Sequence, residues 1–196
     1  MRRILSKHDE EKRKKRNQSI LAFFLLFIMF ASVLGYGLEG NFGSNAGSSE
    51  SNATERANYN GFEFTHQNGL WILKKDGFDF LFKYNPEEAG KTSSTLEAVS
   101  SYKNKPLYIF SESFEAESEV RTNLASFAQR IQNACPENET CGSNIPSKTC
   151  DNNFIIIREG NERILQEGNC VFIWGKTPDL TRIADGFLYK ILGVTN

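Results

Sequence analysis

The sequence predicts an α+β protein in which an N-terminal transmembrane helix precedes an exterior domain. This domain is expected to contain antiparallel β-meanders, two amphipathic helices and two disulfide bonds. Three observations predict this fold class. A long uncharged apolar run lies near the N-terminus, and farther along the chain alternating apolar residues are separated by Asn-Gly and Asp-Gly pairs. Two other segments carry apolar residues at helical spacing. The four cysteines, an even number, all follow the apolar run.

Residues 1–18 form a basic tail and residues 19–38 the predicted transmembrane helix. No charged residue occurs from Ile20 to Leu38, and about 19 residues rising 1.5 Å each span roughly 28 Å, close to the hydrocarbon thickness of a bilayer. A cleaved signal peptide is the main alternative, but its apolar region is shorter, about 7–15 residues, and the best cleavage site, at residues 33–35, is a poor one. A pilin-like signal is a weaker alternative, because the small residue usual before its cleavage site is missing.

The distribution of basic residues predicts the orientation of this helix. The tail carries eight of them: Arg2, Arg3, Lys7, Lys12, Arg13, Lys14, Lys15 and Arg16. None follows the helix until Arg56, so we expect a cytoplasmic N-terminus and an exterior chain from Glu39 onward. The run at 12–16 also fits a nucleic-acid patch or a nuclear localisation signal, but contact with anionic lipid already explains it.

The charge of the exterior part argues against nucleic-acid binding. The whole chain has a net charge of −1 and the tail, with three acidic residues, has +5, which leaves −6 for the remainder. An acidic surface repels a phosphate backbone. The predicted partners are therefore the lipid bilayer, through residues 19–38, and a protein of the cell envelope, with no nucleic acid.

Residues 39–58 are rich in Gly, Ser and Asn and predict a flexible linker with a reach of roughly 20–25 Å. The exterior domain is expected at 59–196, a length typical of one domain. Asn52 and Asn138 each begin a glycosylation sequon and are candidate glycosylation sites on the exterior side.

The start of the exterior domain predicts a β-meander. Asn68-Gly69 and Asp76-Gly77 are preferred tight-turn pairs because they tolerate positive φ. Alternation between the turns indicates that one face is buried. That face is expected to hold Phe62, Phe64, Leu70, Ile72, Phe78, Phe80 and Phe82. A core face is preferred to a sugar-stacking platform for this aromatic stripe.

The middle of the domain predicts short helices, a strand and one longer helix. A helix start is expected at 85–88, a short helix at 96–102 and a strand at 105–113. The longer helix is predicted from the helical spacing of Val120, Leu124, Phe127 and Ile131. Acidic residues in its first turns oppose the positive end of the helix dipole, an interpretation preferred to acid–base catalysis.

The C-terminal helix is predicted most clearly. Thr177 is a suitable cap, Pro178 suits the first helical position, and Gly193 marks the end. Its apolar face comprises Leu180, Ile183, Ala184, Phe187, Leu188, Ile191 and Leu192. A face this wide must pack on a sheet. Asp185, among these apolar residues, is interpreted as a salt-bridge or capping partner.

The cysteines predict the disulfide bonds Cys150–Cys170 and Cys135–Cys141. Three strands are expected near 155–157, 164–165 and 171–174. If they form a meander, the first and third run in the same direction; if the last two form one long strand, it pairs with the first. Either arrangement brings Cys150 close to Cys170. An oxidising compartment favours disulfides, whereas a zinc site is disfavoured by the absence of any Cys-x-x-Cys pair.

The C-terminal segment, "CDNNFIIIREGNERILQEGNCVFIWGKTPDLTRIADGFLYKILGV", resembles the end of uncharacterised single-pass membrane-anchored proteins of archaea, which share the basic tail, the apolar helix and a β-rich exterior. The resemblance covers about 50 residues and the general layout. It implies a prokaryotic cell membrane with the domain facing outward. No activity is known for that family, so the resemblance transfers no catalytic residue.

The sequence does not assign an activity. The only histidines are His8, in the tail, and His66, and the chain lacks a Gly-x-Ser-x-Gly elbow, a His-Glu-x-x-His pair, a phosphate loop and a dinucleotide fingerprint. We therefore expect no catalytic residue, no metal site and no cofactor. The predicted function is a protein-interaction or structural component of the cell envelope.

Two alternatives remain open at the level of sequence. The first is a module that binds a small ligand or glycan, with Trp71, Trp174, Tyr59 or Tyr108 as stacking groups. The second is a cell-surface hydrolase that uses two carboxylates. A flat apolar patch would favour a protein partner, an aromatic-lined groove a glycan, and a cleft with paired acids an enzyme.

Overall fold

The computed structural model describes residues 55–137 and 139–195, all within the compact unit Ser51–Asn196. The predicted basic tail, the transmembrane helix at 19–38 and the sequon residues Asn52 and Asn138 lie outside the described residues. Within the described part of the chain, no helix is both long enough and apolar enough to cross a membrane.

The described elements alternate between strands and short helices. The strands are β1 (Glu55–Tyr59), β2 (Phe62–Gln67), β3 (Leu70–Lys75), β4 (Phe78–Phe82), β5 (Pro106–Ser111), β6 (Arg130–Asn133), β7 (Cys135–Pro136), β8 (Ser147–Lys148), β9 (Asn153–Glu159), β10 (Arg163–Glu167) and β11 (Cys170–Gly175). The α-helices are α2 (Pro86–Ala89), α3 (Phe114–Leu124) and α4 (Leu180–Ile191). The 3-10 helices are η1 (Val99–Tyr102) and η2 (Thr177–Asp179).

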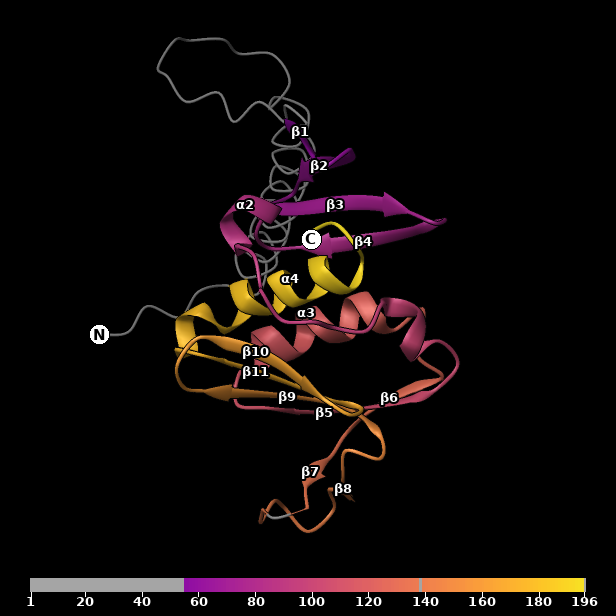
Figure 1. The fold of residues 1–196 in the computed structure, drawn as a ribbon, viewed down its shortest axis with the longest axis vertical. Coiled ribbons are helices and arrows are strands. Elements are labelled where there is room, and N and C mark those ends of the chain that lie inside the picture. Colours follow the sequence, from indigo (N-terminus) through magenta and orange to yellow (C-terminus); the bar gives the residue numbers. More distant parts are fainter. Residues whose placement is uncertain (1–54, 138, 196) are drawn as a thin grey trace, which may run out of the picture. The chain divides into compact units, whose positions relative to one another are not determined.

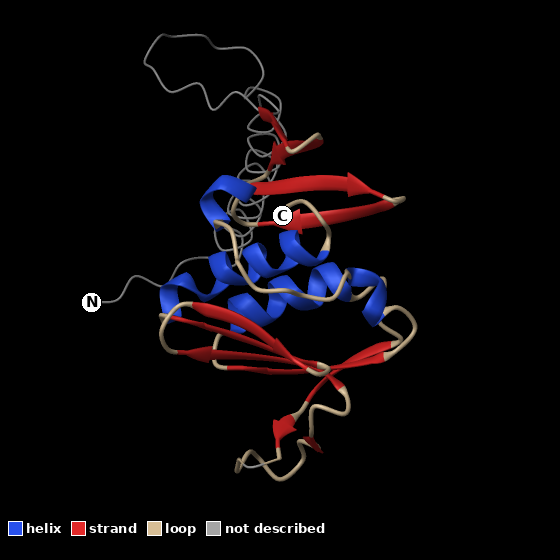
Figure 2. Cartoon of the chain, in the orientation of Figure 1, coloured by secondary structure: helices blue, strands red, loops and turns tan. Residues whose placement is uncertain are grey.

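The elements form three layers, with α3 and α4 lying between two sheets (Figures 1 and 2). One sheet has four strands in the order β1-β2-β3-β4, and the other has five in the order β10-β11-β9-β5-β6. One cluster of buried side chains connects both sheets to both helices. A mixed α+β fold with an antiparallel sheet and two disulfide bonds is thereby confirmed.

The four-stranded sheet is a meander closed by three two-residue turns. The turns are Asn60-Gly61, Asn68-Gly69 and Asp76-Gly77, and both residues of each have positive φ, as turns that match the strand twist require. The meander has one strand more than the sequence predicted. Strand β1 begins at Glu55, so the predicted linker end at residue 58 is wrong and the folded chain starts earlier.

The turn at Asn68-Gly69 also corrects the predicted buried face. A two-residue turn pairs Gln67 with Leu70, which places Leu73 opposite the buried Phe64. Leu73 is therefore buried, whereas Leu70 and Ile72 are only half-buried. The prediction that Leu70 and Ile72 face the core is wrong, because a shift of one residue moves a side chain to the opposite face of a sheet.

The five-stranded sheet corrects the predicted second meander. Strands β5, β6, β9 and β11 are parallel, and only β10 is antiparallel to its neighbour β11. Strand β9 lies between β5 and β11 and pairs directly with β11. All four residues from Phe154 to Ile157 are buried, the continuous apolar pattern of a strand covered on both faces.

Helix α3 is shorter than the apolar spacing predicted. Ser113 caps it by accepting a hydrogen bond from the Ala116 backbone N–H at 3.3 Å, and it ends at Leu124. Ile131, predicted to be helical, lies in β6 opposite Leu107 of β5. The helical spacing of apolar residues continues past Leu124, but the helix does not. The chain at β6 pairs in parallel with β5, which provides its backbone hydrogen bonds.

Helix α4 packs against β11, as its wide apolar face predicted. A methyl group at Gly175 would lie 2.2 Å from Cδ1 of Ile183, so the close approach requires glycine. The predicted cap is displaced, because residues 177–179 form the 3-10 helix η2 and α4 begins at Leu180. Gly193 follows the helix with a φ of 72°, as expected for a terminating glycine.

Candidate functional site

The candidate site is the outer face of the five-stranded sheet, meaning the side turned away from α3 and α4. Alternate residues of β5, β9 and β11 point into the main core, so their neighbours point outward. The outer face is defined here by Tyr108, Phe110, Phe154, Ile156, Arg158, Arg163, Leu165, Phe172 and Trp174. Tyr108, Phe154 and Ile156 are the centre of a second buried cluster, separate from the main core.

Strand register arranges the outer face in rows. Phe110, Ile156, Phe172 and Leu165 are aligned across β5, β9, β11 and β10. In the next row, Trp174 lies between Arg158 and Arg163. The face therefore presents an apolar row beside a row in which two guanidinium groups flank an indole.

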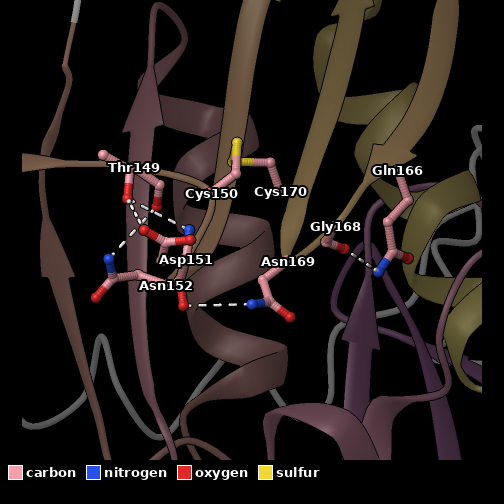
Figure 3. The surroundings of a disulfide bond; sticks show 8 residues. All are labelled: Thr149, Cys150, Asp151, Asn152, Gln166, Gly168, Asn169 and Cys170. Carbon is pink, nitrogen blue, oxygen red and sulfur yellow. Dashed lines mark hydrogen bonds between the residues drawn. A yellow bond between two sulfur atoms is a disulfide. The ribbon is translucent and has the colours of Figure 1, made fainter.

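A disulfide-linked segment at residues 135–150 covers part of this face. Cys135–Cys141 closes a small loop, and strands β7 and β8 lie on the far side of the five-stranded sheet from the helices (Figure 1). Cys150–Cys170 ties the segment to the start of β11, as Figure 3 shows. These are the pairings that the sequence favoured. All four cysteines are oxidised, so none is a free thiolate for a metal or for catalysis.

Hydrogen bonds stabilise the chain around Cys150–Cys170. The Asp151 backbone N–H donates to Oγ1 of Thr149 at 3.3 Å, and Nδ2 of Asn169 donates to the Asp151 carbonyl at 3.3 Å (Figure 3). The contact to Asn169 joins the turn before β9 to the turn before β11. The end of the segment is thus held to the sheet by both covalent and polar contacts.

A pocket of about 310 Å³ lies between the segment and the outer face. Glu139 and Lys148 line it from the segment, and Phe154, Phe172 and Trp174 line it from the sheet. Aromatic carbon and charged groups thus share one concave surface, and such surfaces are common at binding sites.

Three cations lie against aromatic rings on this face. Nζ of Lys148 is 4.6 Å from the centroid of the Tyr108 ring. The guanidinium carbon of Arg158 is 4.9 Å from the centroid of Phe110, and that of Arg163 is 4.2 Å from the centroid of Trp174. A cation within about 6 Å of a ring centroid is attracted by the ring quadrupole.

The same cations differ in their carboxylate partners. Arg158 forms an ion pair with Glu139 of the disulfide-linked segment. Arg163 and Lys148 have no carboxylate partner among the described residues. A hydrogen bond of 3.1 Å from Nη2 of Arg130 to Oη of Tyr108 stabilises the phenolate and lowers the pKa of this tyrosine. Arg163 and Lys148 are therefore without an ion pair among the described residues, while the carboxylate of Glu137 lines the same pocket as Lys148.

The acidic pair that the structure brings together lies elsewhere, between the helices. Burial, followed by the charge of Glu119, raises the pKa of Asp185 to about 9, so that its carboxyl group is protonated at neutral pH. The Tyr84 backbone N–H donates to Oδ2 of Asp185 at 2.9 Å, and that of Lys83 donates to Glu119 at 2.9 Å. Asp185 has no exposed surface, and the pair joins the end of β4 to both helices.

The four candidate stacking residues are divided between the two sheets. Trp71 is buried in the meander against His66, with ring centroids 4.7 Å apart, and Tyr59 packs on the main core. Tyr108 and Trp174 are on the outer face. The Trp174 ring is 5.2 Å from that of Phe172 and tilted from it by 8°.

The sequence did not predict Phe110, Arg158, Arg163 or Phe172 as members of a site. Alternation within β9 and β11 contains part of the signal, since Arg158 and Trp174 each occur two residues after an apolar residue on the same face. The signal was not interpretable without knowing that β9 and β11 are adjacent and that the helices lie on their other face.

No protein-family model matches the sequence, and comparisons with curated proteins and with solved structures give no match.

Proposed function

We propose that the protein is a membrane-anchored exterior domain that binds another protein of the cell envelope through the outer face of its five-stranded sheet. The observation that carries the proposal is the continuous patch of aromatic and arginine side chains on this face. Tyrosine, tryptophan and arginine are the residues most enriched at the centres of protein interfaces. Here Arg158, Arg163 and Trp174 occur on one surface beside an apolar row, with Tyr108 buried on the same side of the sheet.

The architecture of the sheet supports the same proposal. Sheets made of parallel strands are found almost only with both faces covered. In this sheet four of the five strands are parallel, and the helices cover one face. The segment at 135–150 covers the other face only in part, because Phe110, Phe172 and Trp174 stay half-buried. A docked partner would complete the cover.

The glycan alternative is supported less well. A sugar ring stacks on the open face of an aromatic ring, whereas Lys148, Arg158 and Arg163 lie over the rings of Tyr108, Phe110 and Trp174. The hydrolase alternative needs paired carboxylates in a cleft, and the pair Asp185 and Glu119 lies between the helices with Asp185 fully buried.

The proposed location combines the sequence with the disulfide bonds. An apolar run at 19–38 behind a basic tail supports an exterior position of the domain, and two disulfide bonds are favoured in an oxidising exterior compartment. The resemblance to membrane-anchored archaeal proteins suggests a prokaryotic cell surface.

The experiment is site-specific photo-crosslinking in intact cells. A photoreactive amino acid replaces Leu165, which is half-buried on the outer face, and in a matched control it replaces Thr65, which is half-buried on the free face of the meander. We expect a discrete product of one partner protein from position 165 and none from position 65. The same products from both positions, no protein product from position 165, or a product that contains only this chain would overturn the proposal.

A further inference from the structure

We propose that the partner docks with an acidic peptide segment, whose carboxylates bind Arg163 and Lys148 while its apolar side chains cover the row of Phe110, Ile156, Phe172 and Leu165. This inference rests on the proposed function and specifies the chemistry of the partner at the same face.

Two cations of the outer face, Arg163 and Lys148, have no ion pair within the described chain. Arg163 is exposed and Lys148 is half-buried, and both are held against an aromatic ring. Stacking limits the orientations of a long side chain, so less side-chain entropy is lost when an anion binds. With no carboxylate of the described residues on them, both are free to bind an anion from outside.

A third cation of this face, Arg158, already forms an ion pair with Glu139. Glu139 belongs to the loop closed by Cys135–Cys141, and its carboxylate reaches a guanidinium that lies over the Phe110 ring. The chain thus already places one carboxylate on a ring-stacked cation of this face. Arg163 is also stacked on a ring and lies on the other side of Trp174. It is two strand spacings, or about 10 Å, from Arg158.

An apolar row lies beside these cations. Phe110, Leu165 and Phe172 are half-buried, and Ile156 between them is buried. A purely polyanionic ligand would leave the apolar row exposed to solvent. A peptide that alternates acidic and apolar residues would both neutralise the cations and bury the row. Desolvation by the apolar side chains also strengthens the ion pairs.

Cations on the free face of the meander do not offer this combination. Lys74 is 2.8 Å from Asp79, and Arg56 is 3.3 Å from Glu63. These charges are neutralised by neighbours across the strand pair and by solvent. Lys74 therefore provides a matched control for a change of charge.

The test measures binding of the full-length chain, purified in detergent, to a fluorescein-labelled peptide of alternating Glu and Leu. The comparison peptide has Gln in place of Glu, and the variants are Arg163→Glu, Lys148→Glu and the control Lys74→Glu. We expect the Glu peptide to bind in a salt-sensitive manner. Arg163→Glu and Lys148→Glu should each weaken binding at least about tenfold, with the control unchanged and near-native circular dichroism in all variants.

Several results would overturn the inference. They are equal binding of the Gln peptide, unchanged binding by Arg163→Glu, no saturable binding up to about 1 mM, and preferential binding of polygalacturonate, which would identify an acidic glycan as the ligand. If the photo-crosslink from position 165 persists while the peptide fails, the docking face stands and only its acidic specificity is wrong. If that crosslink is absent, the proposed function itself fails.

Discussion

The two sheets of this domain present opposite kinds of surface away from the shared helical layer. The free face of the meander carries short-range ion pairs, Arg56 with Glu63 and Lys74 with Asp79. On the outer face of the five-stranded sheet, cations lie over aromatic rings. Two of these cations, Lys148 and Arg163, lack a carboxylate partner within the described chain. The free face of the meander thus neutralises Arg56 and Lys74 locally, whereas the outer face leaves Arg163 and Lys148 without an ion pair in the described chain.

The origin of the difference lies in strand connectivity. Hairpins joined by two-residue turns build the meander, and an antiparallel sheet tolerates one solvated face. Parallel strands need longer connections, and here the connection from β6 to β9 is the disulfide-linked segment. The large aliphatic residue of that segment is Ile145, and its side chain is exposed. Because the segment buries so little apolar surface, it depends on disulfide bonds to stay folded against the sheet.

The largest effect is expected from Phe154→Ala. Phe154 is only 1 % exposed although it is on the outer face, so its truncation should cost about 3–5 kcal/mol of unfolding free energy, as in a core. Thr65→Ala, on the free face of the meander, should change the unfolding free energy by no more than about 0.5 kcal/mol. Urea unfolding followed by circular dichroism measures both. A cost below about 1 kcal/mol for Phe154→Ala would show that the segment does not cover this residue.

Removal of the disulfide bonds should have the next largest effect. The closed loops differ in length, with sequence separations of 20 for Cys150–Cys170 and 6 for Cys135–Cys141. Loop entropy predicts losses of about 3 and about 2 kcal/mol respectively. Paired Cys→Ala variants in urea unfolding test the order. A larger loss for the short loop would mean that its contacts, such as Glu139 with Arg158, matter more than chain entropy.

A smaller effect is expected at the meander edge, where α3 replaces a neighbouring strand. Asn123 accepts a hydrogen bond from the Leu81 backbone N–H at 2.8 Å and donates one to the Leu81 carbonyl at 2.6 Å. Asn123→Ala leaves both groups without this partner and should cost about 1–3 kcal/mol. Thr122→Ala, at an exposed position of the same helix, is the control. Equal effects would show that the edge is satisfied by water.

The attachment between the meander and the helices is expected to depend on pH through Asp185, with a gradual change in the free energy of unfolding spread over several pH units. Asp185 has a pKa of about 9 in the folded chain and about 3.9 in the unfolded chain. The folded state therefore binds more protons between these values, so the free energy of unfolding should fall as pH rises from about 4 to about 9, by at most about 1.4 kcal/mol per pH unit. Asp185→Asn keeps an uncharged group at this site and should flatten the slope. A wild-type slope retained in the variant would assign the titration to another group.

Several elements could be predicted because their causes are local. The pairs Asn68-Gly69 and Asp76-Gly77 adopt the positive φ angles that their residue types favour. Asn85 and Glu88 form a reciprocal cap at α2, where the sequence predicted a helix start. The disulfide pairing was also predictable, since both expected strand arrangements placed Cys150 beside Cys170.

The errors share a different cause. Ile131 fits a helical period but lies in β6, because pairing with β5 is a contact between segments distant in sequence. Leu70 and Ile72 were placed on the wrong face because apolar residues occur at every position from 70 to 73. In such a run alternation cannot decide the facing, and only the pairing register does.

The sequence by itself therefore determined the turns, the start of α2, the glycine that ends α4 and the even set of disulfide-bonded cysteines, because each depends on residues close along the chain or on a simple count. Only the tertiary structure decided that β9 pairs with β11 in parallel, that both helices lie between the sheets, and that Arg158, Trp174 and Arg163 form one row. The physical reason is that strand partners and buried faces are selected by contacts between distant segments, whose free energy exists only once the layers have packed.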